Sequence, residues 1–185
     1  KGCVANGIDE KAANSIYDSM VDFAKYAFNK SHAAAYAKIS VQTAWLKNYY
    51  PVEFMAALMT SVIDNSAKAA QYLYSCRDMG IKVLPPDINC GQGEFTAEGD
   101  HVRYGMYAIK SLGRPVIDQI IEERERDGRY RTLSDFIERT CQKELINKRA
   151  IENLIKAGAC DSLDGTRKQM AMVYASIVDR VQHDK

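Results

Sequence analysis

The sequence lacks the features of several protein classes. No apolar run reaches the roughly 20 residues of a membrane-spanning helix, and no signal peptide is visible. Its five cysteines are scattered, with neither a Cys-x-x-Cys pair nor a Cys/His cluster, which argues against a zinc site and a disulfide framework. The three histidines lie far apart and suggest no metal site. These absences predict a cytosolic protein with reduced thiols.

What the sequence does have is a globular composition and a local excess of positive charge. Its 185 residues are 46% hydrophobic and 26% charged, and the formal net charge is only +1. The excess falls in residues 101–149, which carry eleven basic and eight acidic residues, although a solvated helical surface would have a similar pattern. Because the chain begins with Lys1 and not with methionine, we expect a segment of a longer protein.

The spacing of apolar residues predicts a mainly α fold. Runs with helical periodicity, bounded by capping residues, glycine or proline, indicate helices at about 9–28, 32–49, 52–63, 66–79, 116–126, 132–137, 147–157 and 165–182. The helix at 52–63 is apolar on most sides, which is typical of a helix central to a core.

One β-hairpin is expected within this helical sequence. Residues 94–96 and 102–104 flank a turn at Gly99-Asp100, and this is the only convincing β signal. We place a domain boundary just before it, between Gly80 and Gly91.

The stretch 28–36, with the sequence FNKSHAAAY, contains a candidate anion site. Ser31 is expected to be the N-cap of the helix that follows, because its hydroxyl can accept from the free amides of a first turn. Lys30 and His32 flank this N-terminus, where a lysine, free amides and the helix dipole together favour phosphate. A capped helix start with a solvated lysine explains the same residues, and both interpretations stay open.

Residues 109–116 have the outline of a short helix, a glycine turn and a second helix. A helix-hairpin-helix unit of this kind directs backbone amides at one DNA phosphate without reading bases, and it has glycine at two positions of the turn. Here Ser111 takes the first position and Gly113 the second. Lys110 and Arg114 can add phosphate contacts. An ordinary helix–helix turn is the alternative.

A second and looser candidate of the same kind covers residues 154–161, with Gly158 in the turn. Lys148 and Arg149 precede its first helix, and Lys156 lies beside the turn. These four residues are candidate DNA contacts, and an ordinary turn between helices is again the alternative.

Several motifs occur in the order that one known family has. They are FNKSHAAAY (28–36), QTAWLK (42–47), YPVEFMAAL (50–58), CRDMGI (76–81), LPPDIN (84–89), RYG (103–105), AIK (108–110), NKR (147–149) and LIKAGA (154–159). Taken together, the chain resembles the alpha subunits of bacterial DNA polymerase III, the C-family replicative polymerases, over nearly all of its length.

This resemblance implies three parts: the end of a fingers domain in residues 1–80, a connector with the β-hairpin in residues 81–105, and a tandem helix-hairpin-helix region that binds DNA in residues 106–185. It also implies that the catalytic aspartates and their Mg²⁺ ions belong to a palm domain outside this chain. The chain alone is therefore expected to be inactive.

The resemblance also implies roles and partners. Lys30, followed by Ser31 and His32, is expected to contact the phosphates of an incoming dNTP, because charge on the triphosphate needs cations and oriented amides. The other implied partners are primer-template duplex DNA and, through regions mostly outside this chain, a sliding clamp and further replisome subunits. The implied location is the bacterial cytoplasm.

Two other functional classes remain alternatives. A stand-alone, non-enzymatic helix-hairpin-helix module would explain residues 106–160 and leave FNKSHAAAY unexplained, and salt-dependent duplex binding by residues 90–185 alone would favour it. A helical protein-interaction scaffold predicts no DNA affinity at any salt concentration, and the sequence lacks the long heptad pattern that would favour it.

Overall fold

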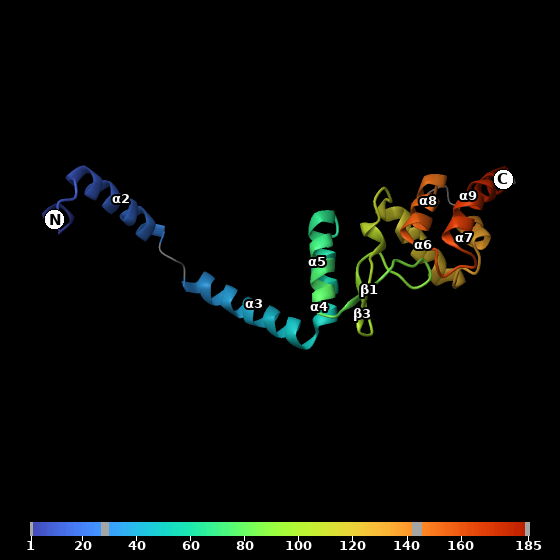
Figure 1. Ribbon diagram of the computed structural model, residues 1–185, viewed down its shortest axis with the longest axis horizontal. Helices are drawn as coiled ribbons and strands as arrows, with labels where there is room; N and C mark the ends of the chain where they lie inside the picture. Colours follow the sequence, from blue (N-terminus) through green and yellow to red (C-terminus); the bar gives the residue numbers. More distant parts are fainter. Residues whose placement is uncertain (1, 27–29, 142–145, 184–185) are drawn as a thin grey trace. The chain divides into compact units, whose positions relative to one another are not determined.

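The computed structural model describes residues 2–26, 30–141 and 146–183 (Figure 1). The chain divides into two compact units, Lys1–Tyr49 and Tyr50–Lys185. The predicted mainly α fold is confirmed in both. Within the described residues, no helix combines the length and the apolar character needed to cross a membrane.

The first unit consists of helices with few buried side chains. Its elements are α1 (Gly2–Ala5), α2 (Glu10–Tyr26) and α3 (Lys30–Tyr49). The predicted start of the first long helix is confirmed, since the Asp9 carboxylate accepts from the Ala12 N–H at 3.0 Å. The prediction that Ser31 is an N-cap is wrong, because Lys30 is already helical and Ser31 lies inside the first turn of α3.

A small sheet and two helices form the first core of the second unit. The elements are α4 (Pro51–Ser61), α5 (Ser66–Asp78), β1 (Lys82–Leu84), β2 (Thr96–Glu98) and β3 (His101–Arg103). Both helices contact this sheet, and Met55, Met59 and Cys76 share a buried cluster with Phe95 and Val102. The expectation that the apolar helix at 52–63 contributes to a core is therefore confirmed.

The predicted hairpin is confirmed, and the structure adds a strand to it. Strands β2 and β3 pair antiparallel around Gly99-Asp100, with Thr96 opposite Arg103. Strand β1 pairs parallel with β3, whereas we predicted no strand there. Its three residues have too short an alternation to identify them, and their partner lies about twenty positions away in sequence.

The packing also crosses the predicted boundary between Gly80 and Gly91. Helices α4 and α5 come before that boundary, yet they share a core with β2 and β3, which come after it. The functional division at residue 80 stays a prediction, and the structural division lies at Tyr49–Tyr50.

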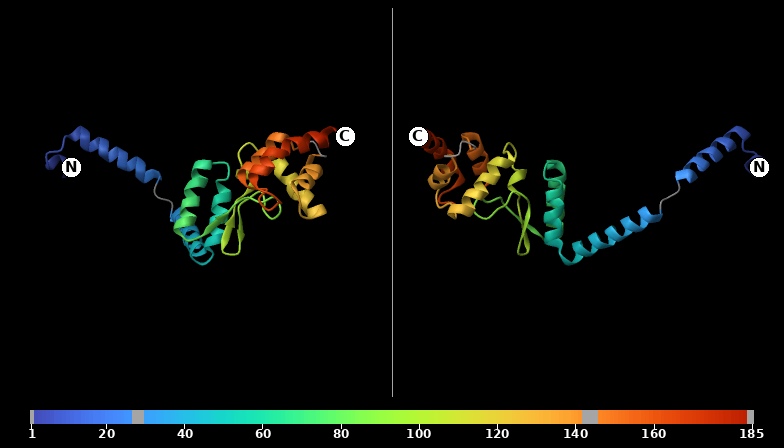
Figure 2. Two further views of the ribbon diagram at one scale, coloured as in Figure 1. Left: turned by 45° about the vertical axis from the view of Figure 1, so that its right-hand side comes forward. Right: turned by 180° about the vertical axis from the view of Figure 1, so that it is seen from behind.

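The larger core lies among the helices that follow. The elements are η1 (Met106–Ala108), α6 (Arg114–Asp127), α7 (Leu133–Cys141), α8 (Lys148–Ala157) and α9 (Arg167–His183). Helix α9 packs against both α7 and α8 (Figure 2). Ile117, Ile120, Phe136, Ile151 and Leu154 are fully buried there, each on the apolar face that helical spacing predicts.

The segment between β1 and β2 is bonded to this helical core. The Ile88 N–H donates to the Ala159 carbonyl at 2.9 Å. The buried Arg124 guanidinium donates to the carbonyls of Ile88 and Gly91, at 3.1 and 2.7 Å. These bonds hold the segment against α6 and the turn that follows α8.

Candidate nucleic-acid interface

The turn between η1 and α6 has the tight geometry expected of the first hairpin. Ser111 has φ +64°, and in the described part of the chain it alone among residues other than glycine has a positive φ. This left-handed conformation explains why glycine suits the position. Gly113 is the N-cap of α6, with φ −75°, and a Cβ there would meet only Pro115, at an ordinary 3.6 Å. Packing within the chain therefore does not require this glycine.

Two basic side chains flank the turn. Lys110 is exposed. The Arg114 guanidinium lies 4.8 Å from the centre of the Tyr107 ring, and its Nη2 lies 3.3 Å from the Asp64 carboxylate. The side chains of Arg114 and Asp64 are 54% and 85% exposed, so this ion pair contributes little to stability and can be exchanged for another anion.

The Tyr107 ring that supports Arg114 is itself held in place. Its hydroxyl donates to the Asp118 carboxylate, and that hydrogen bond raises the pKa of Tyr107, so the phenol stays protonated at neutral pH. Arg114 therefore lies on a fixed, uncharged platform at the start of α6.

Changing Ser111 to glycine should raise the free energy of unfolding by up to about 1 kcal/mol. A left-handed residue with a Cβ costs about 1–2 kcal/mol, and the greater freedom of glycine in the unfolded chain offsets part of that gain. Ser176→Gly, at an exposed position within α9, should instead lower stability by about 0.5–1 kcal/mol. Urea unfolding measures both, and a loss of stability in Ser111→Gly would contradict the strain argument.

The turn at Gly158 differs from the first one. Gly158 is left-handed, with φ +83°, and ends α8 as predicted. However, Gly158 is buried, and a Cβ there would meet the Arg167 guanidinium, which pairs with Asp161. Ala159 beside it is also buried and accepts from the Ile88 N–H. This turn faces protein in the structure, and a phosphate contact of Gly158 stays a prediction.

The basic side chains of the second candidate already have partners. Lys148 pairs with Asp179 of α9, and Lys156 lies 2.6 Å from Glu152. The Glu152 hydrogen bond raises the pKa of Lys156, so this lysine stays charged. Lys148 and Lys156 lie near opposite ends of α8, about 12 Å apart along its axis at 1.5 Å per residue. Arg149, in the first turn, is exposed.

The candidate phosphate contacts of the predicted fingers segment lie in the first unit. Lys30, Ser31 and His32 form the first turn of α3 and are exposed. The His32 ring lies against the Tyr36 ring, with centroids 4.3 Å apart. Phe28 and Asn29 of the same motif lie outside the described residues.

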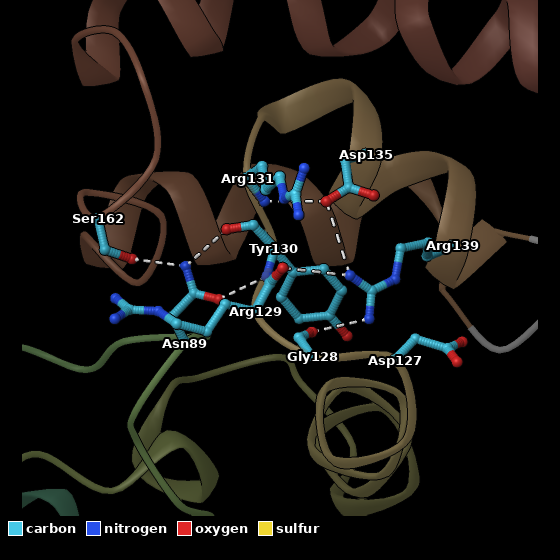
Figure 3. A pocket seen from close by; sticks show the side chains of 9 residues that line it. All are labelled: Asn89, Asp127, Gly128, Arg129, Tyr130, Arg131, Asp135, Arg139 and Ser162. Carbon is cyan, nitrogen blue, oxygen red and sulfur yellow. Dashed lines mark hydrogen bonds and ion pairs between the residues drawn. The ribbon is translucent and has the colours of Figure 1, made fainter.

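A hollow of about 790 Å³ brings together residues that the sequence did not indicate as site residues (Figure 3). Its lining is Asn89, Asp127, Gly128, Arg129, Tyr130, Arg131, Asp135, Arg139 and Ser162. The only sequence signal for this site was the basic excess in residues 101–149. Two of the lining residues, Asn89 and Ser162, come from loops outside that segment.

Comparison with known proteins gives consistent matches. A family model described as "Helix-hairpin-helix motif" matches residues 80–170. "DNA polymerase III subunit alpha" of Saccharopolyspora erythraea is 46% identical over 97% of this chain and 15% of that protein. The subunits of the same name from Vibrio cholerae and Borreliella burgdorferi are 45% and 43% identical over 98% and 100% of this chain, and over 15% and 16% of their own lengths. The chain thus spans about one sixth of these relatives.

Proposed function

Because the chain matches one segment of bacterial DNA polymerase III alpha subunits along almost its whole length, we propose that it is a non-catalytic part of such a polymerase that binds duplex DNA. The turn between η1 and α6 is its main contact. The observation that carries this proposal is the left-handed Ser111 followed by the exposed N-terminus of α6, inside the region that matches the helix-hairpin-helix family model.

The geometry of the turn suits a single phosphate. Helix α6 begins at Arg114, and the carbonyl of Gly113 accepts from the Val116 N–H at 3.1 Å. The N–H groups of Gly113 and Arg114 have no acceptor within the described residues, and Pro115 has no N–H to offer. These two amides, the helix dipole and the charges of Lys110 and Arg114 can bind a phosphate without reading bases.

The polymerase reaction itself depends on segments beyond this chain. Mg²⁺ held in a palm domain would supply positive charge that stabilises the negative charge developing in nucleotidyl transfer. Within residues 2–26, 30–141 and 146–183, the His, Cys, Asp and Glu side chains form no group of three that could hold such an ion. Lys30, Ser31 and His32 would bind and orient the phosphates of the incoming dNTP. The sliding clamp and other replisome subunits would bind through regions mostly outside this chain. The location of the protein would be the bacterial cytoplasm.

Binding of a labelled duplex across salt concentrations tests this proposal. Wild type should bind non-specifically, with an affinity that falls as salt rises. Lys110→Ala/Arg114→Ala should lower the slope of log K against log salt by up to about 2, since each lost phosphate contact removes about 0.9. Arg77→Ala/Lys82→Ala removes two exposed charges elsewhere in the same unit and should change the slope much less.

The outcomes separate the three functional classes. No binding by wild type at low salt would contradict duplex binding and favour a protein-interaction scaffold. Equal slopes for the two double variants would show that the turn is only a helix connection. If residues 50–185 bind as tightly as the whole chain, the stand-alone module gains support, because the first unit is then dispensable for DNA.

A further inference from the structure

The loop between α6 and α7 presents two arginines from a rigid backbone. Arg129 and Arg131 are exposed, and Tyr130 between them is only 2% exposed. The loop therefore buries the Tyr130 side chain and leaves the side chains on both sides of it at the surface. Both line the hollow described above (Figure 3).

Tyr130 is held by both its backbone and its side chain. Its N–H donates to Asn89 Oδ1 at 2.7 Å, and Asn89 Nδ2 donates to its carbonyl at 3.0 Å. Its hydroxyl donates to the Ile120 carbonyl at 2.8 Å. Its ring contacts Phe136 edge-on, at 5.0 Å, while the Arg139 guanidinium lies 4.4 Å from its centre. The segment is therefore preorganised, which lowers the entropic cost of ligand binding.

The neighbouring arginines are occupied by protein groups, unlike this pair. Arg126 bonds Glu123 and Asp127, at 2.5 and 2.9 Å, and Arg139 donates to the carbonyls of Glu123 and Gly128. For the guanidiniums of Arg129 and Arg131, the described residues offer no acceptor within hydrogen-bond distance. Their charges are available to a ligand.

The carboxylates near the hollow are already paired. Hydrogen bonds from Arg126 lower the pKa of Asp127, so this group stays ionised and bound to its arginine. The Asp135 carboxylate accepts from the backbone N–H of Arg131 at 2.9 Å and lies 3.6 Å from the Arg139 guanidinium. Among the charged residues that line the hollow, three arginines (Arg129, Arg131 and Arg139) face two carboxylates (Asp127 and Asp135). The net charge is positive.

We propose that Arg129 and Arg131 form a second phosphate-binding site, separate in sequence from the turn between η1 and α6. Guanidiniums bind phosphate oxygens in a bidentate manner, which makes arginine better suited than lysine to this ligand. The phosphate belongs either to a duplex backbone or to free pyrophosphate or nucleotide. If the phosphate belongs to a duplex, this proposal rests on the function proposed above. It then adds a second DNA contact, just after the C-terminal end of α6.

The first arm of the test measures duplex binding. Arg129→Ala/Arg131→Ala should lower the salt slope of log K by up to about 2, whereas Arg77→Ala/Lys82→Ala should not. Arg129→Lys/Arg131→Lys keeps both charges and should retain most of the slope while binding more weakly, because the bidentate geometry is lost. Thermal melts of each variant should show an unchanged fold, because both positions are exposed.

The second arm titrates pyrophosphate into ¹⁵N-labelled protein and follows the arginine Nε–Hε signals. Saturable shifts at Arg129 and Arg131, together with a loss of the calorimetrically measured pyrophosphate binding in the double alanine variant, would support the site with free phosphate as ligand. If wild type binds no duplex, the proposed function fails and this arm alone decides the site. An unchanged salt slope together with no pyrophosphate shifts at these arginines would overturn the proposal.

Discussion

Replacing Asn89 by alanine should lower the free energy of unfolding of the second unit by about 2–4 kcal/mol. The Asn89 side chain bonds both the N–H and the carbonyl of Tyr130, across 41 positions of sequence. Alanine would leave both backbone groups unpaired in a buried site, and each orphaned group costs about 1–3 kcal/mol. Urea unfolding followed by circular dichroism measures the loss.

Matched substitutions separate this clamp from its surroundings. Ser162→Ala removes a partner of Asn89 Nδ2, 3.2 Å away, but leaves both bonds to Tyr130, so a loss below about 1 kcal/mol is expected. Asn89→Asp keeps the acceptor for the Tyr130 N–H, loses the donor to the Tyr130 carbonyl and brings in a buried charge. It should therefore lower the free energy of unfolding by more than Ser162→Ala does. If Asn89→Ala were no worse than Ser162→Ala, the clamp would not stabilise the fold.

Freeing Tyr130 should also affect binding. The Arg129 and Arg131 guanidiniums depend on the fixed backbone between them, so Asn89→Ala should weaken duplex binding even though it removes no charge. A variant that stays folded but keeps the wild-type salt slope and affinity would show that the two arginines act independently of this clamp.

Local sequence signals predicted the features that depend on neighbouring residues. The helices predicted to begin at about residues 66 and 147 begin at Ser66 and Lys148, where the side chains of Asn65 and Asn147 accept from the Lys68 and Ala150 N–H groups at 3.1 and 2.9 Å. The hairpin at Gly99-Asp100 is similarly local. Ser31 shows the limit of this reasoning, because a capping residue type also fits inside a first turn when Lys30 before it is itself a good helix former.

Features that depend on distant pairs could not be predicted from the sequence. Strand β1 is defined by its pairing with β3, and the Asn89–Tyr130 bonds join two loops that no periodicity connects. Lys148 was expected as a DNA contact, but its partner Asp179 lies 31 positions away on α9. For Ser111, in contrast, the local motif was informative: the residue occupies a position where the turn usually has glycine, and the structure gives it a left-handed backbone.

Replacing Phe136 by alanine should have the largest effect on stability, a loss of about 3–5 kcal/mol. Phe136 is fully buried in α7, and its ring forms the floor against which Tyr130 packs. Alanine removes most of the ring's buried area and leaves a cavity that the surrounding α6, α7 and α9 side chains can fill only in part. Folded domains have about 5–15 kcal/mol to lose, so the variant should still be folded at 25 °C, with a much lower melting temperature.

Two further substitutions show whether this loss comes from the core. Phe136→Leu keeps most of the volume and should cost about 1–2 kcal/mol. Tyr74→Ala removes an aromatic ring that is 69% exposed on α5 and should change stability by no more than about 0.5 kcal/mol. Because the Phe136 ring packs against Tyr130, Phe136→Ala should also reduce the contribution of Arg129 and Arg131 to duplex binding, as we expect for Asn89→Ala. A loss of less than about 1 kcal/mol in the free energy of unfolding for Phe136→Ala would mean that Phe136 is not packed in the core in solution. The rigid presentation of Arg129 and Arg131 would then lose its physical basis.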